Sequence, residues 1–482
     1  MNKIILIFLC FNTQAFAKPI GLKELGQAFL KNNYDIRIEQ TKLGIKEGQV
    51  TQAKGKFDFN LSYSFSYSDN NTPSSSTLDG SGSAASVESG SQSHSLTLSK
   101  DFQTGTTLSI PMSFSKDRSA SSYSIFPISH STSLALSLDQ KITGLFGSGY
   151  FSKDLDKSSM QAEIEKFKTD EKVAKTFLKF VENYFDVIKS QKNLKIMQLS
   201  TENDQKNLDF LEQKFKYGKS SKVELLEAKA NLAKTKQRLF NEQMNLFKKS
   251  HELKLMAYGE IDKEVEHQFD ETLFKPFELL LEKNEEALFS SSLENRPETQ
   301  KFSQELELAQ KAFAHAKVDS FPDVEIGYDM TSKGLADTLE QSSENTLDQK
   351  YLTHQYSMTV NFPIMGYAKR GSHKINELKV EQARLKLDQY RYDVRLELRT
   401  LLKELKGQKE VIKAMKVSVE AQEEKLKFFQ KRFKLGKITI FDLNKILIQR
   451  EKNVLEYNDS QFKYYKLFSK FLKGQGQLLS VL

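Results

Sequence analysis

The chain has 482 residues, enough for several folded parts and a substantial core. Hydrophobic residues make up 38% of the chain and the mean hydropathy is −0.53. No run of eighteen apolar residues follows the N-terminal segment, which excludes a helical membrane protein. The net charge of +8 does not predict nucleic-acid binding, because Lys residues alternate with Glu instead of clustering.

Residues 1–17 have the pattern of a secretory signal peptide. Lys3 makes a basic start, an apolar run follows from Ile4 to Phe11, and Ala15-Phe16-Ala17 is a small-residue cleavage signal. We expect the mature chain to begin at Lys18. Cys10, the only cysteine, lies in this segment in a poor lipoprotein context, so we expect neither a disulfide nor a lipid anchor.

Residues 18–56 are predicted to form the opening helix of a first repeat, and residues 57–150 a set of strands. The helix has apolar residues at helical spacing: Leu22, Leu25, Phe29, Ile36, Leu43 and Val50. From Leu61 to Tyr67 the period becomes two, with large apolar residues separated by serine. The same alternation occurs at Leu96/Leu98, Leu108/Ile110/Met112/Phe114 and Leu134/Leu136/Leu138. Gln103-Thr104-Gly105 is predicted to be a turn, and Pro73 to Gly90 an exposed loop.

Residues 151–257 are predicted to form a long helical hairpin with coiled-coil seams. If continuously helical, the arm from Lys153 to Phe215 would span roughly 90 Å at ~1.5 Å per residue. Its seam positions are Phe167, Ala174, Phe177, Val181, Tyr184 and Ile188. Residues 258–285 are interpreted as a linker. A second repeat then follows: an opening helix over 286–320, strands over 321–364 and a hairpin over 365–482.

The two predicted hairpins turn at nearly identical sequences, Phe215 to Lys219 and Phe433 to Lys437. Gly218 and Gly436 stand where a residue with left-handed backbone would end the first arm. Each glycine is followed by Ser or Thr with a carboxylate three residues later, which predicts a capping box that starts the second arm. The pairs are Ser221 with Glu224, and Thr439 with Asp442.

The alternating strands allow two interpretations, a soluble antiparallel sheet and the wall of a membrane barrel. Strand lengths near ten residues, small hydroxyl residues on the polar face and the long helices favour the barrel. The sequence supplies four strands in the first repeat and two in the second, whereas the smallest common barrels need about eight. Because unpaired strand edges are prohibitive in lipid, several protomers would have to share one barrel.

This order of segments resembles the TolC-like outer membrane efflux family over nearly the whole mature chain. The most specific features are the two Phe-Lys-X-Gly-Lys turns, each followed by a carboxylate. The remaining matches are Asn32-Asn33-Tyr34-Asp35, Asn295-Arg296-Pro297-Glu298, Phe321-Pro322 and Asn361-Phe362-Pro363.

The resemblance implies an α+β membrane protein in the outer membrane of a Gram-negative bacterium. Three protomers would form a shared transmembrane β-barrel, embedded in outer-membrane lipid and continuous with a long α-helical, coiled-coil periplasmic tunnel. Its function would be that of a passive exit duct in a tripartite efflux or type I secretion system. The implied partners are a periplasmic adaptor protein and an inner-membrane pump, either a resistance-nodulation-division (RND) pump or an ABC exporter.

The resemblance also implies particular site residues. Acidic residues in the second hairpin ring the family's constriction, and the first of these positions matches Asp442. The usual second acid is replaced by Lys445, so the two could pair and change closure and ion preference. Glu224 is the first-repeat counterpart of Asp442. Helix capping is an alternative role for both carboxylates, and for Glu224 it is the favoured one.

The hairpin tips are the second predicted site. In the family the adaptor contacts these turns, which here contain Gly218, Lys219, Gly436 and Lys437. A simple helix C-cap explains the same residues and is compatible with a contact surface.

The strand count departs from the family, in which four strands per protomer are usual. The segment from Ser93 to Gln140 supplies an additional hairpin. Three protomers could therefore form an eighteen-strand pore, or the extra pair could lie outside a smaller barrel.

No enzyme, metal or cofactor chemistry is predicted. The seven histidines are scattered without ligand spacing, and Gly218-Lys219-Ser220 lacks the first glycine of a phosphate-binding loop. Two other functions stay open at this point: a secreted structural or adhesive coiled-coil protein with a soluble β-domain, and a periplasmic adaptor. The adaptor is disfavoured because adaptors have one hairpin.

Overall fold

The computed structural model describes residues 21–73, 86–119, 125–147, 149–257 and 284–481. The expected signal peptide, nearly all of the 258–285 linker and the centre of the 73–90 loop lie outside these residues. The chain is α+β and divides into two compact units. Unit 1 comprises Met1–Lys42, Lys166–Lys301 and Asp388–Leu482, and unit 2 comprises Leu43–Glu165 and Phe302–Leu387.

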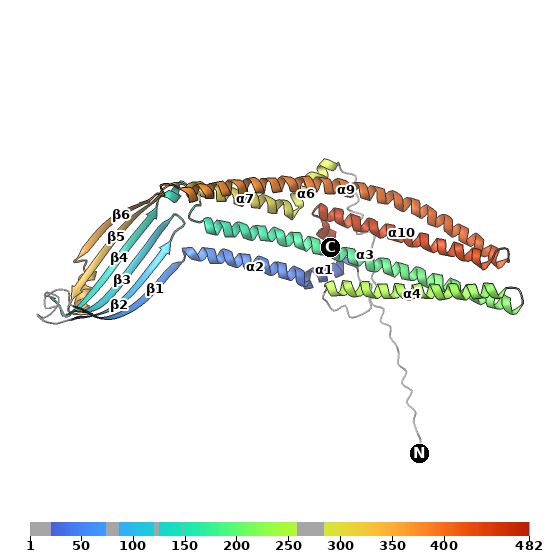
Figure 1. Ribbon diagram of the computed structural model, residues 1–482, viewed down its shortest axis with the longest axis horizontal. Coiled ribbons are helices and arrows are strands. Elements are labelled where there is room, and N and C mark those ends of the chain that lie inside the picture. Colours follow the sequence, from blue (N-terminus) through green and yellow to red (C-terminus); the bar gives the residue numbers. More distant parts are fainter. Residues whose placement is uncertain (1–20, 74–85, 120–124, 148, 258–283, 482) are drawn as a thin grey trace, which may run out of the picture. The chain divides into compact units, whose positions relative to one another are not determined.

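Within the described residues, unit 2 contains one antiparallel sheet of six strands whose spatial order follows the sequence (Figure 1). The strands are β1 (Phe59–Pro73), β2 (Ser86–Asp101), β3 (Thr106–Ser119), β4 (Ile128–Lys141), β5 (Asp323–Ala336) and β6 (Leu352–Asn361). The four alternating segments predicted in the first repeat lie in β1 to β4, and β5 and β6 lie within residues 321–364. The 103–105 turn between β2 and β3 is also confirmed, with Gly105 at φ 80°. The additional hairpin therefore belongs to the same sheet as the other strands.

The two faces of this sheet differ in chemistry because apolar residues alternate with serine and threonine in register. Leu61 pairs with Leu98, and Leu98 pairs with Ile110, so the large side chains of neighbouring strands share one face. We call this the apolar face. The opposite face, the hydroxyl face, carries residues such as Ser64, Ser95, Ser113, Ser133 and Thr331.

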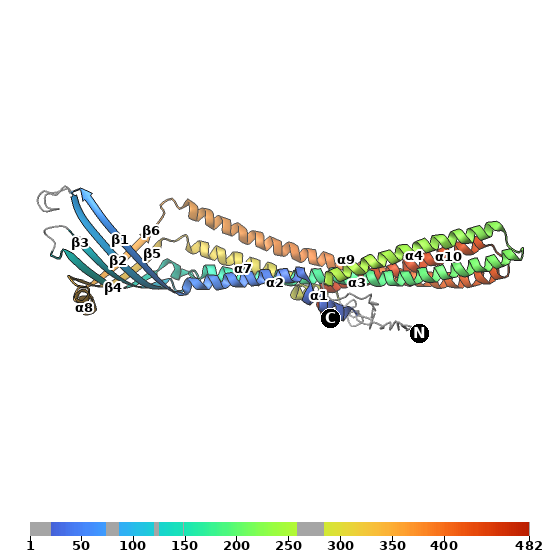
Figure 2. The same cartoon turned by 90° about the horizontal axis from the view of Figure 1, so that it is seen from below.

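A short helix that the sequence analysis did not predict, α8 (Leu339–Leu347), lies in the connection between β5 and β6 and packs on the sheet (Figure 2). Ser342 is fully buried there and its hydroxyl donates to the carbonyl of Gly334, 3.0 Å away. A Cβ atom on Gly334 would come within 1.9 Å of the Ser342 carbonyl oxygen, so only glycine allows this close approach.

The remaining helices begin and end as follows: α1 (Leu22–Asn32), α2 (Tyr34–Lys54), α3 (Lys153–Lys216), α4 (Lys222–Ala257), α6 (Glu285–Asn295), α7 (Pro297–Val318), α9 (Tyr367–Lys434) and α10 (Ile440–Gly474). Short 3₁₀ turns span Gly55–Phe57, Thr143–Phe146 and Leu478–Val481. In unit 1, α3 with α4 and α9 with α10 form two antiparallel hairpins that lie side by side (Figures 1 and 2).

Each predicted opening helix is broken once, at equivalent positions of the two repeats. Asn33 separates α1 from α2, and Arg296 separates α6 from α7; both have extended backbone with ψ 125°. Arg296 precedes Pro297, which disfavours a helical residue there. Asn33 donates a 2.7 Å hydrogen bond to the carbonyl of Met256 near the end of α4. Arg296 donates in the same way to the carbonyl of Gly474, the last residue of α10.

The core of unit 1 is rich in aromatic residues. Phe29 of α1 stacks on Phe180 of α3 with ring centroids 4.3 Å apart, and both side chains are fully buried. The predicted seam residues Phe177, Val181, Tyr184 and Ile188 belong to the same cluster, together with Phe462, Phe468, Phe471 and Leu472 of α10. Burying each such side chain contributes about 1.5–3 kcal/mol, so packing rather than helix propensity holds these arms together.

Candidate functional site

The two hairpin turns have the same backbone conformation. Gly218 has φ 69° and Gly436 has φ 70°. The amide of Lys219 donates to the carbonyl of Lys214 over 2.8 Å, and the amide of Lys437 donates to Arg432 over 2.9 Å. Together with the bonds from Gly218 to Phe215 and from Gly436 to Phe433, these make a Schellman motif at each turn.

Both predicted capping boxes are confirmed. The amide of Glu224 donates to the Ser221 hydroxyl over 3.2 Å, and the amide of Ser221 donates back to the Glu224 carboxylate over 3.1 Å. In α10 the corresponding distances between Thr439 and Asp442 are 3.3 and 3.1 Å. In both repeats the same pair of bonds satisfies the N-cap amide and the amide three residues later, which lets a new helix start directly after the turn.

Asp442 is exposed, and its carboxylate is used by the cap. The hydroxyl of Thr439 donates to it over 2.7 Å; this bond first, then the Thr439 amide and the charge of Lys445, lowers the pKa of Asp442. Within the described part of the chain no ion pair joins Asp442 to Lys445. The alternative in which these two side chains pair directly is therefore not seen in one protomer.

The tips are open surfaces. Gly218, Lys219, Gly436 and Lys437 are all exposed, and nothing lies within 4 Å of a Cβ placed on either glycine. Large apolar side chains flank the lysines: Tyr217 is 79% exposed and Leu435 is 70% exposed. Each tip thus offers a cation and an apolar side chain next to each other.

Behind the tips, a small apolar cluster joins the two hairpins. Phe210 of α3 contacts Phe433 of α9 edge to face, with centroids 5.7 Å apart, and the ammonium of Lys214 lies near both rings. The buried members of this cluster are Leu208, Leu211, Ala228, Leu232, Phe433, Ile440 and Leu443. The two hairpins are therefore packed on each other directly behind their exposed tips.

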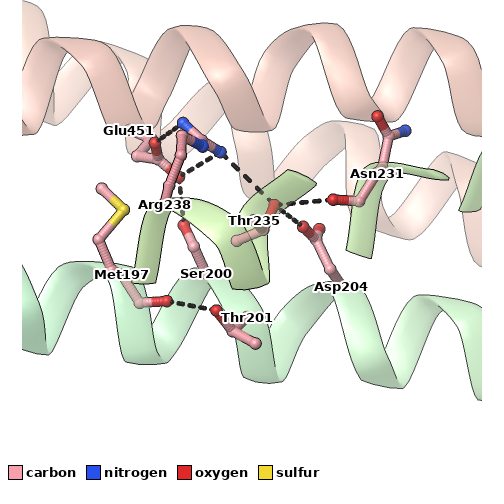
Figure 3. A network of polar contacts seen from close by, with 8 residues as sticks. All are labelled: Met197, Ser200, Thr201, Asp204, Asn231, Thr235, Arg238 and Glu451. Carbon is pink, nitrogen blue, oxygen red and sulfur yellow. Dashed lines mark hydrogen bonds and ion pairs between the residues drawn. The ribbon is translucent and has the colours of Figure 1, made fainter. Parts of the chain in front are cut away.

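Further along the hairpins, a buried polar network links α3, α4 and α10 (Figure 3). Glu451 of α10 is 4% exposed and forms an ion pair with Arg238 of α4. Ser200 of α3 donates to the same carboxylate over 2.7 Å. Because a buried carboxylate is costly unless it is paired, this contact constrains how the second hairpin packs on the first. We call Ser200, Arg238 and Glu451 the inter-hairpin latch.

Asp204 lies beside the latch and accepts a 2.7 Å hydrogen bond from Thr235. Burial raises the pKa of Asp204, and the nearby Glu451 adds to the rise, against the Thr235 bond and the charge of Arg238. A cavity of about 60 Å³ adjoins these side chains. Arg238 Nε and Asn444 Nδ2 are buried nearby without a hydrogen-bond partner among the described residues.

The latch could not be recognised from the sequence. Arg238 and Glu451 are 213 positions apart, and each stands on a helix face with many other charges. Neither residue belongs to a motif, so only the packing of the two hairpins brings them together.

Among the described residues, no group of three His, Cys, Asp or Glu side chains is placed so that it could hold a metal ion. Ser220 of the Gly218-Lys219-Ser220 sequence donates to Glu224 over 2.8 Å at the hairpin turn, which is a helix-capping environment. No helix in the described ranges is long and apolar enough to cross a bilayer.

The chain has an α+β architecture of two tandem repeats, each with a broken opening helix, strands of one shared sheet and a capped helical hairpin. The chain belongs to the outer membrane efflux protein family, whose sequence pattern matches residues 25–257 and 288–458. It is therefore an outer-membrane efflux channel with a periplasmic extension, and not an enzyme.

Solved structures support the same fold. The chain is similar to CusC at 13% identity and a TM-score of 0.68, over 97% of this chain and 92% of that one. It is similar to the Campylobacter jejuni outer membrane channel CmeC at 13% identity and 0.65, over 95% and 85%. For the Vibrio cholerae outer membrane protein VceC the values are 12% identity and 0.67, over 94% and 95%. No curated protein sequence matches the chain.

Proposed function

We propose that three copies of this chain close one β-barrel of about eighteen strands in the outer membrane. Two features of the sheet support this proposal. It has one apolar and one hydroxyl face, and its outer strands β1 and β6 each have a single neighbour among the described strands. In lipid, the backbone groups of those edges need partners, which β6 and β1 of neighbouring copies supply.

The apolar face would contact lipid and the hydroxyl face would line the pore. Tyr63 and Tyr67 of β1 are 64% and 67% exposed in the single chain, and Tyr356 and Met358 of β6 are 79% and 68% exposed. Such large exposed side chains at both edges are expected where a neighbouring strand and lipid cover them.

The test of this proposal is the oligomer and its conductance. A trimer that resists SDS until heated, and that conducts ions in planar bilayers, is the expected result. A monomer that stays in solution without detergent would overturn the proposal. Tyr63→Pro on the β1 edge should remove both properties, because its backbone could no longer complete the ladder. Tyr63→Phe, which keeps the backbone amide and nearly the same side-chain volume, is the matched control and should keep the trimer.

We further propose that the helices extend the pore through the periplasm as the exit duct of a tripartite system. Energy would come from an inner-membrane pump of the RND or ABC class, including type I secretion, and a periplasmic adaptor would connect the two. The adaptor would contact the hairpin tips at Gly218, Lys219, Gly436 and Lys437. Support comes from the exposed lysines and the adjacent Tyr217 and Leu435.

The gate of this duct would lie close to the same tips. Asp442 and Lys445 are exposed on the first turns of α10, where charges of neighbouring copies could meet, and Glu224 holds the equivalent position on α4. Opening would require the second hairpin to move against the first. The inter-hairpin latch opposes that movement, because separating Arg238 from Glu451 leaves a buried charge unpaired.

A further inference from the structure

The helix α8 occupies a definite place on the apolar face of the sheet. Its buried side consists of Ser342 and Thr346, which contact Thr132 of β4 and Ser332 of β5. Thr132 pairs with Gly334, and Ser332 pairs with Leu134. Those register pairs put the contacts on the same face as Leu134, Leu136 and Met330.

The position of α8 coincides with the end of the apolar side chains on the two strands that it covers. On β4 the apolar series ends at Leu134, and the next residue on that face is Thr132. On β5 it ends at Met330, and the next residues on that face are Ser332 and Gly334. Without α8, two hydroxyl groups and a bare stretch of backbone would stand at the edge of the apolar face.

On the first three strands the same edge is formed differently, by rings followed by charges. Phe65, His94 and Phe114 form a row across β1, β2 and β3, with centroid distances of 4.9 and 5.7 Å. The imidazole of His130 on β4 stacks on Phe114 at 6.2 Å, one pair further out than Thr132, and ends the row. Beyond Phe114, the same face of β3 carries Lys116 and Arg118. Aromatic rows followed by charges mark the boundary between hydrocarbon and water in outer-membrane sheets.

The side of α8 that faces away from the sheet cannot lie in hydrocarbon. Glu340 and Glu344 are exposed there, and a carboxylate in the bilayer centre is costly. At the two ends of the helix, Leu339 and Leu347 are 45% and 72% exposed. Exposed leucines next to exposed carboxylates suit an interfacial helix, with apolar groups toward the acyl chains and charges toward water.

We propose that α8 lies in the headgroup layer of the outer leaflet, where it covers β4 and β5 at the level at which Thr132, Ser332 and Gly334 supply no ring. This inference rests on the proposed function, because it needs the apolar face to contact lipid. The occupant of its outer surface is then the lipid headgroup layer. Gly334 makes this possible, since any side chain there would push the helix off the sheet.

Depth-dependent fluorescence quenching tests the proposal on the full-length chain. Single cysteines carrying an environment-sensitive dye are placed by Leu347→Cys, Met112→Cys and Ser113→Cys in a Cys10→Ser background. The trimers are reconstituted in phosphatidylcholine vesicles that contain a nitroxide either on the headgroup or deep in the acyl chain. Met112 lies on the apolar face of β3, one row inside Phe114 and level with Leu134, and its neighbour Ser113 points to the hydroxyl face, so they are matched controls.

The dye at 347 is expected to be quenched more by the headgroup nitroxide, the dye at 112 more by the acyl-chain nitroxide, and the dye at 113 by neither. Adding Gly334→Ala should change the quenching at 347 and leave that at 112 unaltered. If the acyl-chain nitroxide quenches the dye at 112 but neither nitroxide quenches the dye at 347, the inference about α8 fails and the channel proposal stands. If 112 is not quenched by lipid either, the channel proposal itself fails.

Discussion

Arg238 of α4 and Glu451 of α10 form an ion pair across the two hairpins, although they are 213 positions apart in the chain. The carboxylate is buried, whereas 36% of the arginine side chain is exposed to solvent. The two partners are therefore not equivalent. Loss of the arginine leaves a buried carboxylate without its partner, whereas loss of the glutamate leaves a cation that water can reach.

Arg238→Ala is expected to lower the free energy of unfolding of the helical part by about 2 kcal/mol. The loss is smaller than for a fully buried ion pair because solvent reaches Arg238. Urea unfolding followed by helix circular dichroism measures this. Lys206→Ala is the matched control, because Lys206 pairs with Glu202 over 2.6 Å on the surface of α3. The control should lose under about 0.5 kcal/mol. Equal losses in the two variants would show that the latch contributes nothing special.

Asp204→Asn is expected to raise stability at neutral pH. The folded-state pKa of Asp204 lies above its ordinary value, so the charged form disfavours the folded state at pH above both values. As the pH falls through the folded-state pKa toward 3.8, the wild-type chain gains this stability back and the difference from Asp204→Asn shrinks. Melting temperatures of both proteins between pH 7 and 4 test this; a difference that stays constant with pH would contradict it.

Gly436→Ala is expected to cost about 1–2 kcal/mol, because φ is 70° and a Cβ disfavours that conformation even in open space. Gly407→Ala, in the interior of α9 and equally open, should instead stabilise by about 0.5–1 kcal/mol. Unfolding of the two variants in parallel distinguishes the signs. A loss in both would mean that side-chain crowding, not backbone conformation, decides the result.

Asp442→Ala and Lys445→Ala are each expected to raise single-channel conductance of the closed state if these side chains hold the gate. Glu224→Ala is the natural comparison, because Glu224 has the same capping role in the first repeat. Since Asp442→Ala also removes a cap, Asp442→Asn should be recorded beside it. Closed-state conductance unchanged in all four variants would rule these residues out as gate residues.

Photo-crosslinking residues at positions 219 and 437 are expected to capture a periplasmic protein in cells that make the whole system. Position 206 is the control, since the Lys206 side chain is 68% exposed on α3 away from the turn. Mass spectrometry of the products identifies the adaptor, and the adaptor in turn indicates the pump. Capture at 206 but at neither tip would contradict the assignment of the tips as the adaptor surface.

Elements governed by local rules could be predicted from the sequence. The strands follow from serine alternating with large apolar residues, as in Leu61 to Tyr67, and the turns follow from glycine and the capping pairs. These signals lie within a few residues of each other. The repeat of Phe215–Lys219 at Phe433–Lys437 strengthened them, because two copies rarely share a turn sequence by chance.

Features that depend on distant residues could not be predicted. The helix α8 has only nine residues and no apolar stripe; it is held by Ser342 and Thr346, which have unremarkable helix propensity. Its stability comes from Thr132, more than two hundred positions earlier in the chain, and that contact exists only when β4 and β5 pair. The latch escaped prediction for the same reason.

The breaks at Asn33 and Arg296 bear on how such a chain could have arisen. Each of these residues donates to a carbonyl at the end of the hairpin that belongs to its own half, Met256 for the first and Gly474 for the second. Each half therefore has its own hydrogen bond between the break in its opening helix and its last helix. An ancestral polypeptide half this size could have used the same hydrogen bond. Gene duplication and fusion would then have joined two such subunits into one chain, with the bond retained in each half.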